Sequence, residues 1–224
     1  MKEINVLGVN IKDYPLKELL KLSTDYLLGP GVHTMSWLSA NVLLSVSENS
    51  QEQGPWVEDL DLMLCDQAGL LKSGRAASQL HRDGKSEDFM ENFFKYLGTN
   101  GATISIVSDS TSAGEHLNKK LRGYSDRLNI ISRHVYDNTD DMDDLFNDLN
   151  LKNPKLVITC LPWVRQGPLL DMARQISNAS FWISVLPEMI IDDRATIVEK
   201  NEALLDRFLF GRRVATYQKN DEKK

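Results

Sequence analysis

Three runs, ATISIV at residues 102–107, LVITCL at 156–161 and FWISVL at 181–186, decide the fold of this chain. Each run is short, apolar and rich in β-branched residues, which is typical of a strand buried on both faces of a sheet. Longer segments with helical spacing of apolar residues separate them. This alternation predicts βαβ units with right-handed crossovers, and therefore a mostly parallel sheet covered by helices on both faces.

The same alternation extends outward to both ends of the chain. Further strands are predicted at residues 4–9, 33–38, 61–65 and 128–135. Helices are predicted at residues 15–28, 41–48, 87–97, 113–121, 140–149, 166–176 and 198–210. Glycines close two of these helices, Gly98 the one at 87–97 and Gly211 the last. We therefore predict a single α/β domain with a Rossmann-like sheet over residues 1–206, followed by a basic tail over 207–224.

Composition and charge exclude several classes of protein. The chain has 224 residues, of which 42% are hydrophobic and 26% charged, as in an ordinary globular domain. Its net charge of −6 argues against a dedicated nucleic-acid binder. No apolar run approaches the roughly 18 residues of a membrane span, and the first residues lack the apolar core of a signal peptide. Location in the cytoplasm is therefore expected. The two cysteines, Cys65 and Cys160, and four scattered histidines form no zinc pattern, so we expect no metal.

Polar residues follow most of the predicted strands. In open parallel sheets, ligands bind outside the carboxyl ends of the strands. These positions are residues 39–41, 66–69, 108–112, 162–166 and 187–188.

Asp66, which closes an apolar strand, has two interpretations. Partial burial there would raise its pKa and suit it to work as a general base. Taken alone, the sequence favours the other interpretation, in which Asp66 caps the next helix. Ser39 and Asn41 also have two interpretations. They are suited equally to binding sugar hydroxyls or phosphate and to capping the next helix.

The remaining motifs are weaker. The loop Arg82–Lys85 is suited to a diphosphate, although a solvated loop is the simpler interpretation. After the strand at 156–161, Arg165 or Gln166 is placed to reach a ligand. Asp59-Leu60-Asp61 has the form of a metal-binding pair, but it begins a strand, so we predict that it faces solvent at the opposite edge. The absence of a glycine-rich dinucleotide fingerprint and of a P-loop lowers the expectation of a nicotinamide cofactor or an ATP site, and we expect no cofactor.

Taken in order, these stretches resemble the WecG/TagA/CpsF family of glycosyltransferases. Asn5–Val9 resembles its opening NVLGV strand, Ser39-Ala40-Asn41 its Thr-x-Asn, and Asp66–Leu71 its Asp-Gly-x-Gly-Val-Val. Weaker similarities follow along the chain, at Arg82–Asp88, Asp193–Ala195, Glu202–Arg207 and Arg212–Arg213. The resemblance is most specific in the first 90 residues.

The resemblance implies a function. Members of the family transfer a sugar, of the N-acetylmannosamine type or a hexose, from a UDP-sugar donor to a prenyl-diphosphate-linked acceptor. Their products are cell-surface polymers, and the enzymes act peripherally at the inner face of the membrane. By resemblance, Asp66 is the general base of an inverting transfer. Other roles carry over in the same way: Ser39, Asn41, Gly69, Arg82 and Gln166 bind substrate, and Arg207, Arg212 and Arg213 face the lipid diphosphate or the anionic membrane surface.

The chain departs from the family after its central strand. Ser108-Asp109-Ser110 stands where the family has two glycines, and an aspartate there repels a phosphate. This change favours an alternative, a non-catalytic relative that binds a nucleotide sugar or partner proteins of the same pathway. The apolar residues Phe208–Phe210 allow a homo-oligomer or membrane contact, although core packing is the simpler interpretation.

Overall fold

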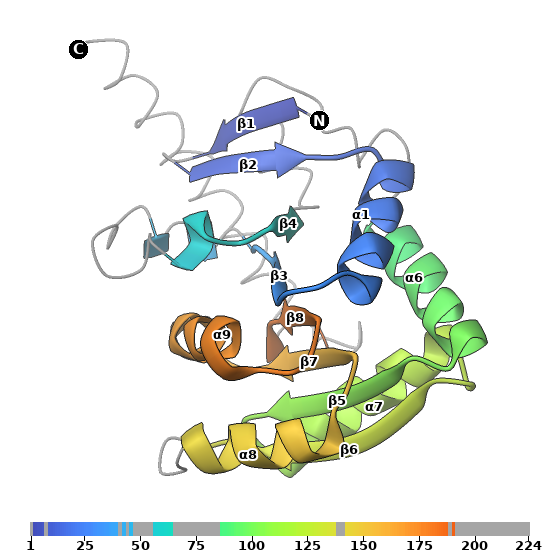
Figure 1. Cartoon of the computed structure of the whole chain (residues 1–224). Coiled ribbons are helices and arrows are strands. Elements are labelled where there is room, and N and C mark those ends of the chain that lie inside the picture. Colours follow the sequence, from blue (N-terminus) through green and yellow to red (C-terminus); the bar gives the residue numbers. More distant parts are fainter. Residues whose placement is uncertain are drawn as a thin grey trace, which may run out of the picture.

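A computed structural model of the chain confirms the predicted α/β fold (Figure 1). The structure describes residues 2–6, 9–39, 42–43, 45–46, 56–64, 86–137, 142–187 and 190. In this part of the chain the main sheet consists of β3 (His33–Trp37), β4 (Leu62–Leu64), β5 (Thr103–Ser108), β6 (Asn129–Val135), β7 (Leu156–Cys160) and β8 (Phe181–Val185). The helices are α1 (Leu16–Leu28), α6 (Ser86–Asn100), α7 (Thr111–Tyr124), α8 (Met142–Lys152) and α9 (Trp163–Ile176).

The main sheet has six strands in the order β4-β3-β8-β7-β5-β6, and every neighbouring pair is parallel. Every residue of the central strands β7 and β8 is buried. This burial on both faces explains why these strands appear in the sequence as continuous apolar runs rather than as alternating patterns.

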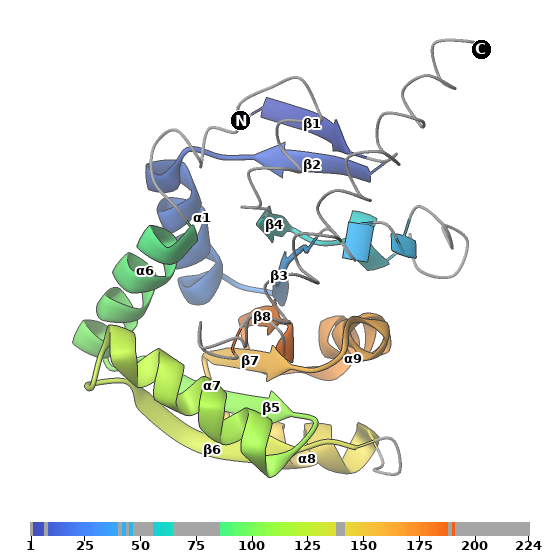
Figure 2. The same cartoon turned by 180° about the vertical axis from the view of Figure 1, so that it is seen from behind.

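Two hydrophobic layers cover the sheet. Alternate strand residues such as Ile158 and Ile183 pack against α1, α6 and α7, whereas Val157 and Trp182 pack against α8 and α9. Figures 1 and 2 show these helix groups on opposite sides of the sheet. The aromatic side chains of Phe89, Phe93 and Phe94 on α6 fill much of the first layer.

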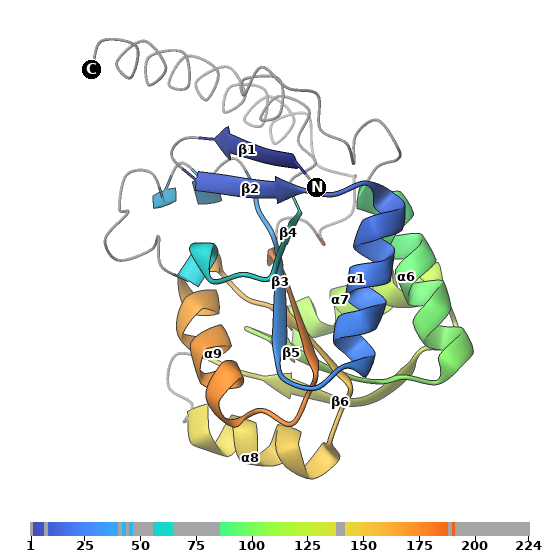
Figure 3. The same ribbon diagram turned by 45° about the horizontal axis from the view of Figure 1, so that its top comes forward.

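The predicted single strand at residues 4–9 is wrong. The structure has an antiparallel hairpin here, formed by β1 (Lys2–Val6) and β2 (Val9–Asp13), and Val6 pairs with Val9. Alternating burial explains why residues 9–13 form a strand of their own. Val9 and Ile11 are buried, while Asn10 and Lys12 are exposed. The hairpin lies outside the main sheet, next to the end of β4 (Figure 3). Val9 and Ile11 join the α8–α9 hydrophobic layer there.

Gly98 does not close α6, contrary to the sequence prediction. The helix continues to Asn100, and Gly101 follows it with a φ of 65°, a conformation that favours glycine. Gly98 instead permits close packing, because a Cβ at this position would lie 2.4 Å from the Oγ of Ser125. The helix α9 also differs from its predicted start at Gln166, because it begins three residues earlier, after Pro162. The predicted helix at 198–210 lies outside the described residues.

Gly167 on α9 gives a testable measure of how tightly one helix is packed. A Cβ at Gly167 would lie 2.7 Å from Cδ1 of Trp56, whose ring is buried and rigid. We expect Gly167→Ala to lower the free energy of unfolding by about 1–3 kcal/mol, because overpacking forces side chains and backbone to shift. Gly123→Ala on α7 is the matched control. No atom lies within 4 Å of its Cβ position, so we expect a gain of up to about 1 kcal/mol. Urea unfolding of both variants measures these changes, and equal effects would contradict the packing argument.

Candidate functional site

The carboxyl ends of the parallel strands form the candidate site. From β5 the chain passes to α7 on one face of the sheet, and from β7, the neighbouring strand, it passes to α9 on the other face. Connections that diverge in this way mark the switch point of a sheet, and open α/β sheets typically bind ligands outside the strand ends at that point. At this switch point, a backbone hydrogen bond from Asp109 N to Cys160 O at 3.3 Å joins the end of β7 to the turn after β5.

Ser39 lies two residues beyond β3, at this edge of the sheet, and its side chain is buried. Its Oγ accepts a hydrogen bond from the backbone N–H of Val42 at 3.3 Å, at the start of the helical residues that follow. The structure therefore shows the capping role. A hydroxyl oxygen has a second lone pair and its own proton, so a ligand contact by Ser39 stays a prediction. The other predicted site residues lie outside the described part of the chain: Asn41, Asp66, Gly69, Arg82, Arg207, Arg212 and Arg213.

Gln166 also lies at the carboxyl edge, but its side chain points into the protein. It is completely buried in the first half of α9. Its Oε1 accepts a hydrogen bond from Thr159 Oγ1 at 2.8 Å. Its Nε2 donates to the carbonyl oxygens of Leu161 at 2.8 Å and Val185 at 3.2 Å. Both amide protons are thereby used within the protein, so Gln166 joins the ends of β7 and β8 to α9. Its predicted contact with substrate stays a prediction.

A row of hydroxyl side chains supports this amide. Ser36, Ser184 and Thr159 occupy the same register on the neighbouring strands β3, β8 and β7, and all are buried. The Oγ atoms of Thr159 and Ser184 are 3.1 Å apart. This network has a signature in the sequence that the motifs considered above do not include. A single Ser or Thr lies one residue before the end of each of the two apolar strands β7 and β8, at matching positions.

The turn after β5, residues Ser108–Ser110, is held by hydrogen bonds within itself. Ser108 Oγ donates to the Ser110 carbonyl at 2.9 Å, and Ser110 Oγ donates to Asp109 Oδ1 at 3.1 Å. Ser110 Oγ also accepts from the N–H of Ala113 at 3.2 Å and so caps α7. The carboxylate of Asp109 adds negative charge beside this helix start. These contacts make the turn poorly suited to cradle a phosphate.

Arg165 and Tyr136 form a pair at the same edge. Tyr136 follows β6, and its backbone N–H donates to Ser108 O at 2.8 Å. Arg165, in the first turn of α9, donates from Nη2 to Tyr136 O at 2.6 Å. Its guanidinium carbon lies 4.8 Å from the centre of the Tyr136 ring, which is a cation–π contact. The pair therefore places a positive charge beside the ends of β5, β6 and β7.

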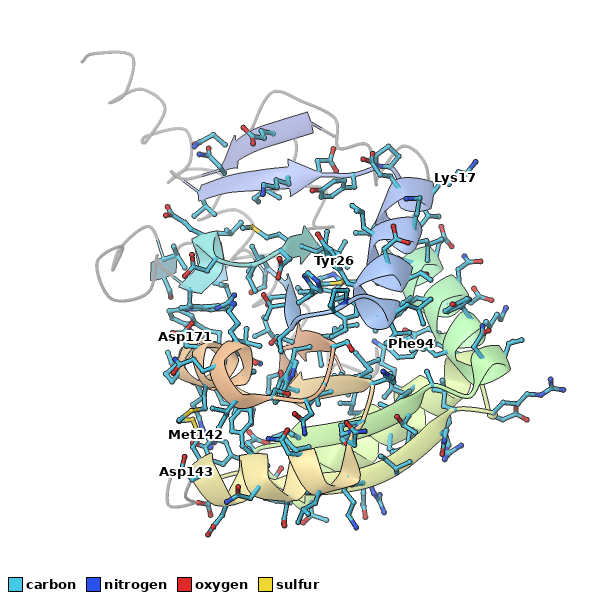
Figure 4. The ribbon with its side chains drawn as sticks, in the orientation of Figure 1. Lys17, Tyr26, Phe94, Met142, Asp143 and Asp171 are labelled. Atoms are coloured by element: carbon cyan, nitrogen blue, oxygen red, sulfur yellow. The ribbon has the colours of Figure 1, made fainter. Side chains whose placement is uncertain are left out.

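The opposite edge of the sheet holds the Asp-x-Asp pair, as predicted. Asp61 Oδ2 accepts hydrogen bonds from the backbone N–H of Thr34 at 2.8 Å and from its Oγ1 at 3.2 Å. Arg174 on α9 donates to Thr34 Oγ1 at 2.9 Å and to the carbonyl of Asp59 at 2.8 Å. Arg174 also pairs with Asp171, which lies on the outer side of α9 (Figure 4). Asp61 is thus a structural acceptor, only about one-third exposed, rather than a fully solvent-facing side chain.

His134 on β6 makes stability depend on pH. Burial lowers the pKa of its imidazole, and Lys152 acts in the same direction, whereas Asp148 opposes the shift. The unfolded chain, with a histidine pKa of about 6.5, therefore binds this proton before the folded chain does. The stability that the neutral His134 contributes is fully present above pH 6.5. It is lost as the pH falls toward the lower pKa that His134 has in the folded protein.

We expect His134→Gln to weaken the loss of stability between pH 8 and pH 5.5, because it removes this protonation step. Urea unfolding at both pH values measures the difference between variant and wild type. The exposed His116 on α7 provides the control substitution, His116→Gln. An unchanged pH dependence in His134→Gln would contradict the role assigned to this group.

A comparison with models of known families shows which family the chain belongs to. The model of the family described as Glycosyl transferase WecG/TagA/CpsF matches residues 4–185, from β1 to the last residue of β8. The chain belongs to this family. Comparison with curated proteins gave no significant match. WecG/TagA/CpsF proteins are glycosyltransferases that act in the synthesis of cell-surface polysaccharides and teichoic acids.

Two further observations concern membrane spans and metal ligands. Within the described ranges, no helix combines the length and the apolar character that crossing a bilayer requires. The same residues include no group of three or more His, Cys, Asp or Glu side chains arranged to hold a metal ion. Ser39, Gln166 and Arg165, near the carboxyl ends of the strands, are the described part of the candidate site of this WecG/TagA/CpsF transferase.

Proposed function

We propose that this WecG/TagA/CpsF transferase moves a sugar from a UDP-sugar to a prenyl-diphosphate-linked acceptor at the cytoplasmic face of the membrane. The donor sugar is of the N-acetylmannosamine type or a hexose. The observation that carries the proposal is the family match, which spans β1 to β8 and so includes every described strand end. The assignment of donor and acceptor follows from resemblance to the family in the stretches around Asn41, Asp66 and Arg82.

The proposed step is an inverting displacement. Asp66 takes the proton from the acceptor hydroxyl as its oxygen attacks the anomeric carbon of the donor. The new glycosidic C–O bond forms on the face opposite the leaving group, the bond from carbon to the UDP oxygen breaks, and UDP leaves with the bonding electrons. Ser39, Asn41, Gly69 and Arg82 hold the substrates. Gln166 contributes by keeping the ends of β7 and β8 in place, as its hydrogen bonds indicate.

The basic residues near the end of the chain have a separate proposed role. Arg207, Arg212 and Arg213 contact the lipid diphosphate or the anionic membrane surface. Each basic residue near such a surface contributes about 1 kcal/mol of attraction.

A second candidate, a non-catalytic relative that binds a nucleotide sugar, has one observation in its favour. The turn at Ser108–Ser110 is closed by its own hydrogen bonds and carries the carboxylate of Asp109. A site that holds the donor's phosphates less closely would bind without efficient transfer.

A transfer assay with the purified full chain distinguishes these candidates. UDP-N-acetylmannosamine, UDP-N-acetylglucosamine and UDP-glucose serve as donors, with a short prenyl-diphosphate-linked N-acetylglucosamine as acceptor. The expected result is formation of a disaccharide-linked lipid and an equal amount of UDP, detected by mass spectrometry. Binding of a UDP-sugar without product over all acceptors tested would support the non-catalytic relative instead.

A further inference from the structure

Arg165 and Arg174 lie on the same helix, α9, yet the protein uses their charges differently. Arg174 has an ion pair with Asp171 at 2.9 Å and further hydrogen bonds to Thr34 Oγ1 and to Asp59 O. Arg165 has one hydrogen bond to a carbonyl, that of Tyr136, and the Tyr136 ring beneath its guanidinium. Within the described ranges, Arg165 makes no ion pair. The two arginines thus form a natural comparison, one with a carboxylate partner and one without.

The geometry of Arg165 suits an anion. A guanidinium has five N–H donors in a planar fork, and one hydrogen bond to Tyr136 O leaves most of them available. The side chain is about half-buried, so its charge is less hydrated than that of a surface arginine. Contact with the Tyr136 ring and carbonyl fixes the guanidinium in place before any ligand arrives, which reduces the entropy lost on binding.

Arg165 also lies close to the ends of β5 and β7. Tyr136 is joined to the end of β5 through its hydrogen bond to Ser108 O, and Asp109 N bonds to Cys160 O at the end of β7. Arg165 therefore lies beside the switch point between these two strand ends. The turn on the β5 side of this switch point uses its own hydroxyl groups and carries a carboxylate, so an anion there requires a cation from another element.

We propose that Arg165, fixed by Tyr136, binds the diphosphate of the nucleotide-sugar donor. This inference rests on the proposed function for the identity of the donor. Arginine suits the role because its fork matches two phosphate oxygens at once. A diphosphate is also present in the prenyl-linked acceptor, so the test includes a lipid diphosphate as a second ligand.

Isothermal titration of the full chain with UDP, and separately with farnesyl diphosphate, tests the proposal. We expect Arg165→Gln to weaken UDP binding about 10- to 100-fold, because a hydrogen-bonded charge is lost. Arg165→Lys should bind with intermediate affinity, since it keeps the charge without the fork. Arg174→Gln is the matched control, and its UDP affinity should equal that of wild type. Circular dichroism establishes that each variant is folded.

Each outcome bears on the proposal separately from the proposed function. Equal UDP affinity in wild type and Arg165→Gln would overturn the role of Arg165 and leave the transferase intact. A loss confined to farnesyl diphosphate would support a diphosphate site that serves the acceptor. A loss of UDP affinity in a chain that transfers no sugar would support Arg165 and contradict the proposed catalysis. Failure of the wild type to bind either ligand would overturn both.

Discussion

Asp66→Asn is expected to lower kcat for sugar transfer by about 10²- to 10⁴-fold, the contribution that a general base typically makes. Asparagine has nearly the same shape as aspartate but cannot accept a proton from the acceptor hydroxyl. Substrate binding should change much less, because the amide still forms hydrogen bonds. The measurement is the steady-state rate of UDP release with the prenyl-linked acceptor, together with the dissociation constant for UDP.

Asp61→Asn provides the control, because Asp61 directly precedes the strand β4 that Asp66 follows in the sequence. Asp61 precedes β4 and accepts its hydrogen bonds from Thr34 at the amino-terminal edge of the sheet. This variant should lose some stability and keep its kcat, because it lies far from the strand ends that form the candidate site. Full turnover in Asp66→Asn would show that the base is another residue. An equal loss of kcat in Asp61→Asn would show that the loss in Asp66→Asn is not specific to a base.

The architecture was predictable from sequence because burial on both faces leaves a strong signal. Runs such as LVITCL and FWISVL contain scarcely any polar residues, so their identity as central parallel strands follows from hydrophobicity alone. The prediction of a single strand from the N-terminal run INVLGV was wrong because it also relied on hydrophobicity alone. A continuous apolar run does not show where a chain reverses, and the pairing of Val6 with Val9 depends on contacts with the rest of the fold. The prediction that Gly98 ends a helix was wrong because glycine can either end a helix or allow close packing. The close packing of Gly98 against Ser125 cannot be recognised from the local sequence.

The candidate site was predictable at the level of the sheet edge but not of the side chain. Strand order and direction place Ser39, Arg165 and Gln166 at the carboxyl ends, as the sequence indicated. Which way each side chain points depends on how α9 packs on the sheet. That packing turns Gln166 inward toward Thr159. It also brings Arg165 onto Tyr136, which is 29 residues away in the sequence.

The inward orientation of Gln166 predicts a large loss of stability when this side chain is replaced. We expect Gln166→Leu to lower the free energy of unfolding by about 3 kcal/mol, because each buried polar group left without a partner costs about 1–3 kcal/mol. The carbonyl oxygens of Leu161 and Val185 would each lose a donor, whereas the Thr159 hydroxyl would keep Ser184 Oγ, 3.1 Å away, as a partner. Leucine recovers part of the cost through burial of its apolar side chain. Urea unfolding monitored by tryptophan fluorescence measures the change.

A double-mutant cycle separates the hydrogen-bond network from the loss of shape. Thr159→Val removes the hydroxyl that donates to Gln166 and keeps the branched side chain. If the network acts as a unit, the double variant should be less destabilised than the sum of the two single variants, with a coupling energy of about 0.5–3 kcal/mol. Additive effects would mean that Gln166 stabilises the protein without Thr159. A Gln166→Leu variant of normal stability that no longer binds UDP would instead make the amide a ligand contact. The buried amide and the half-buried Arg165 would then serve the same site from adjacent positions on α9.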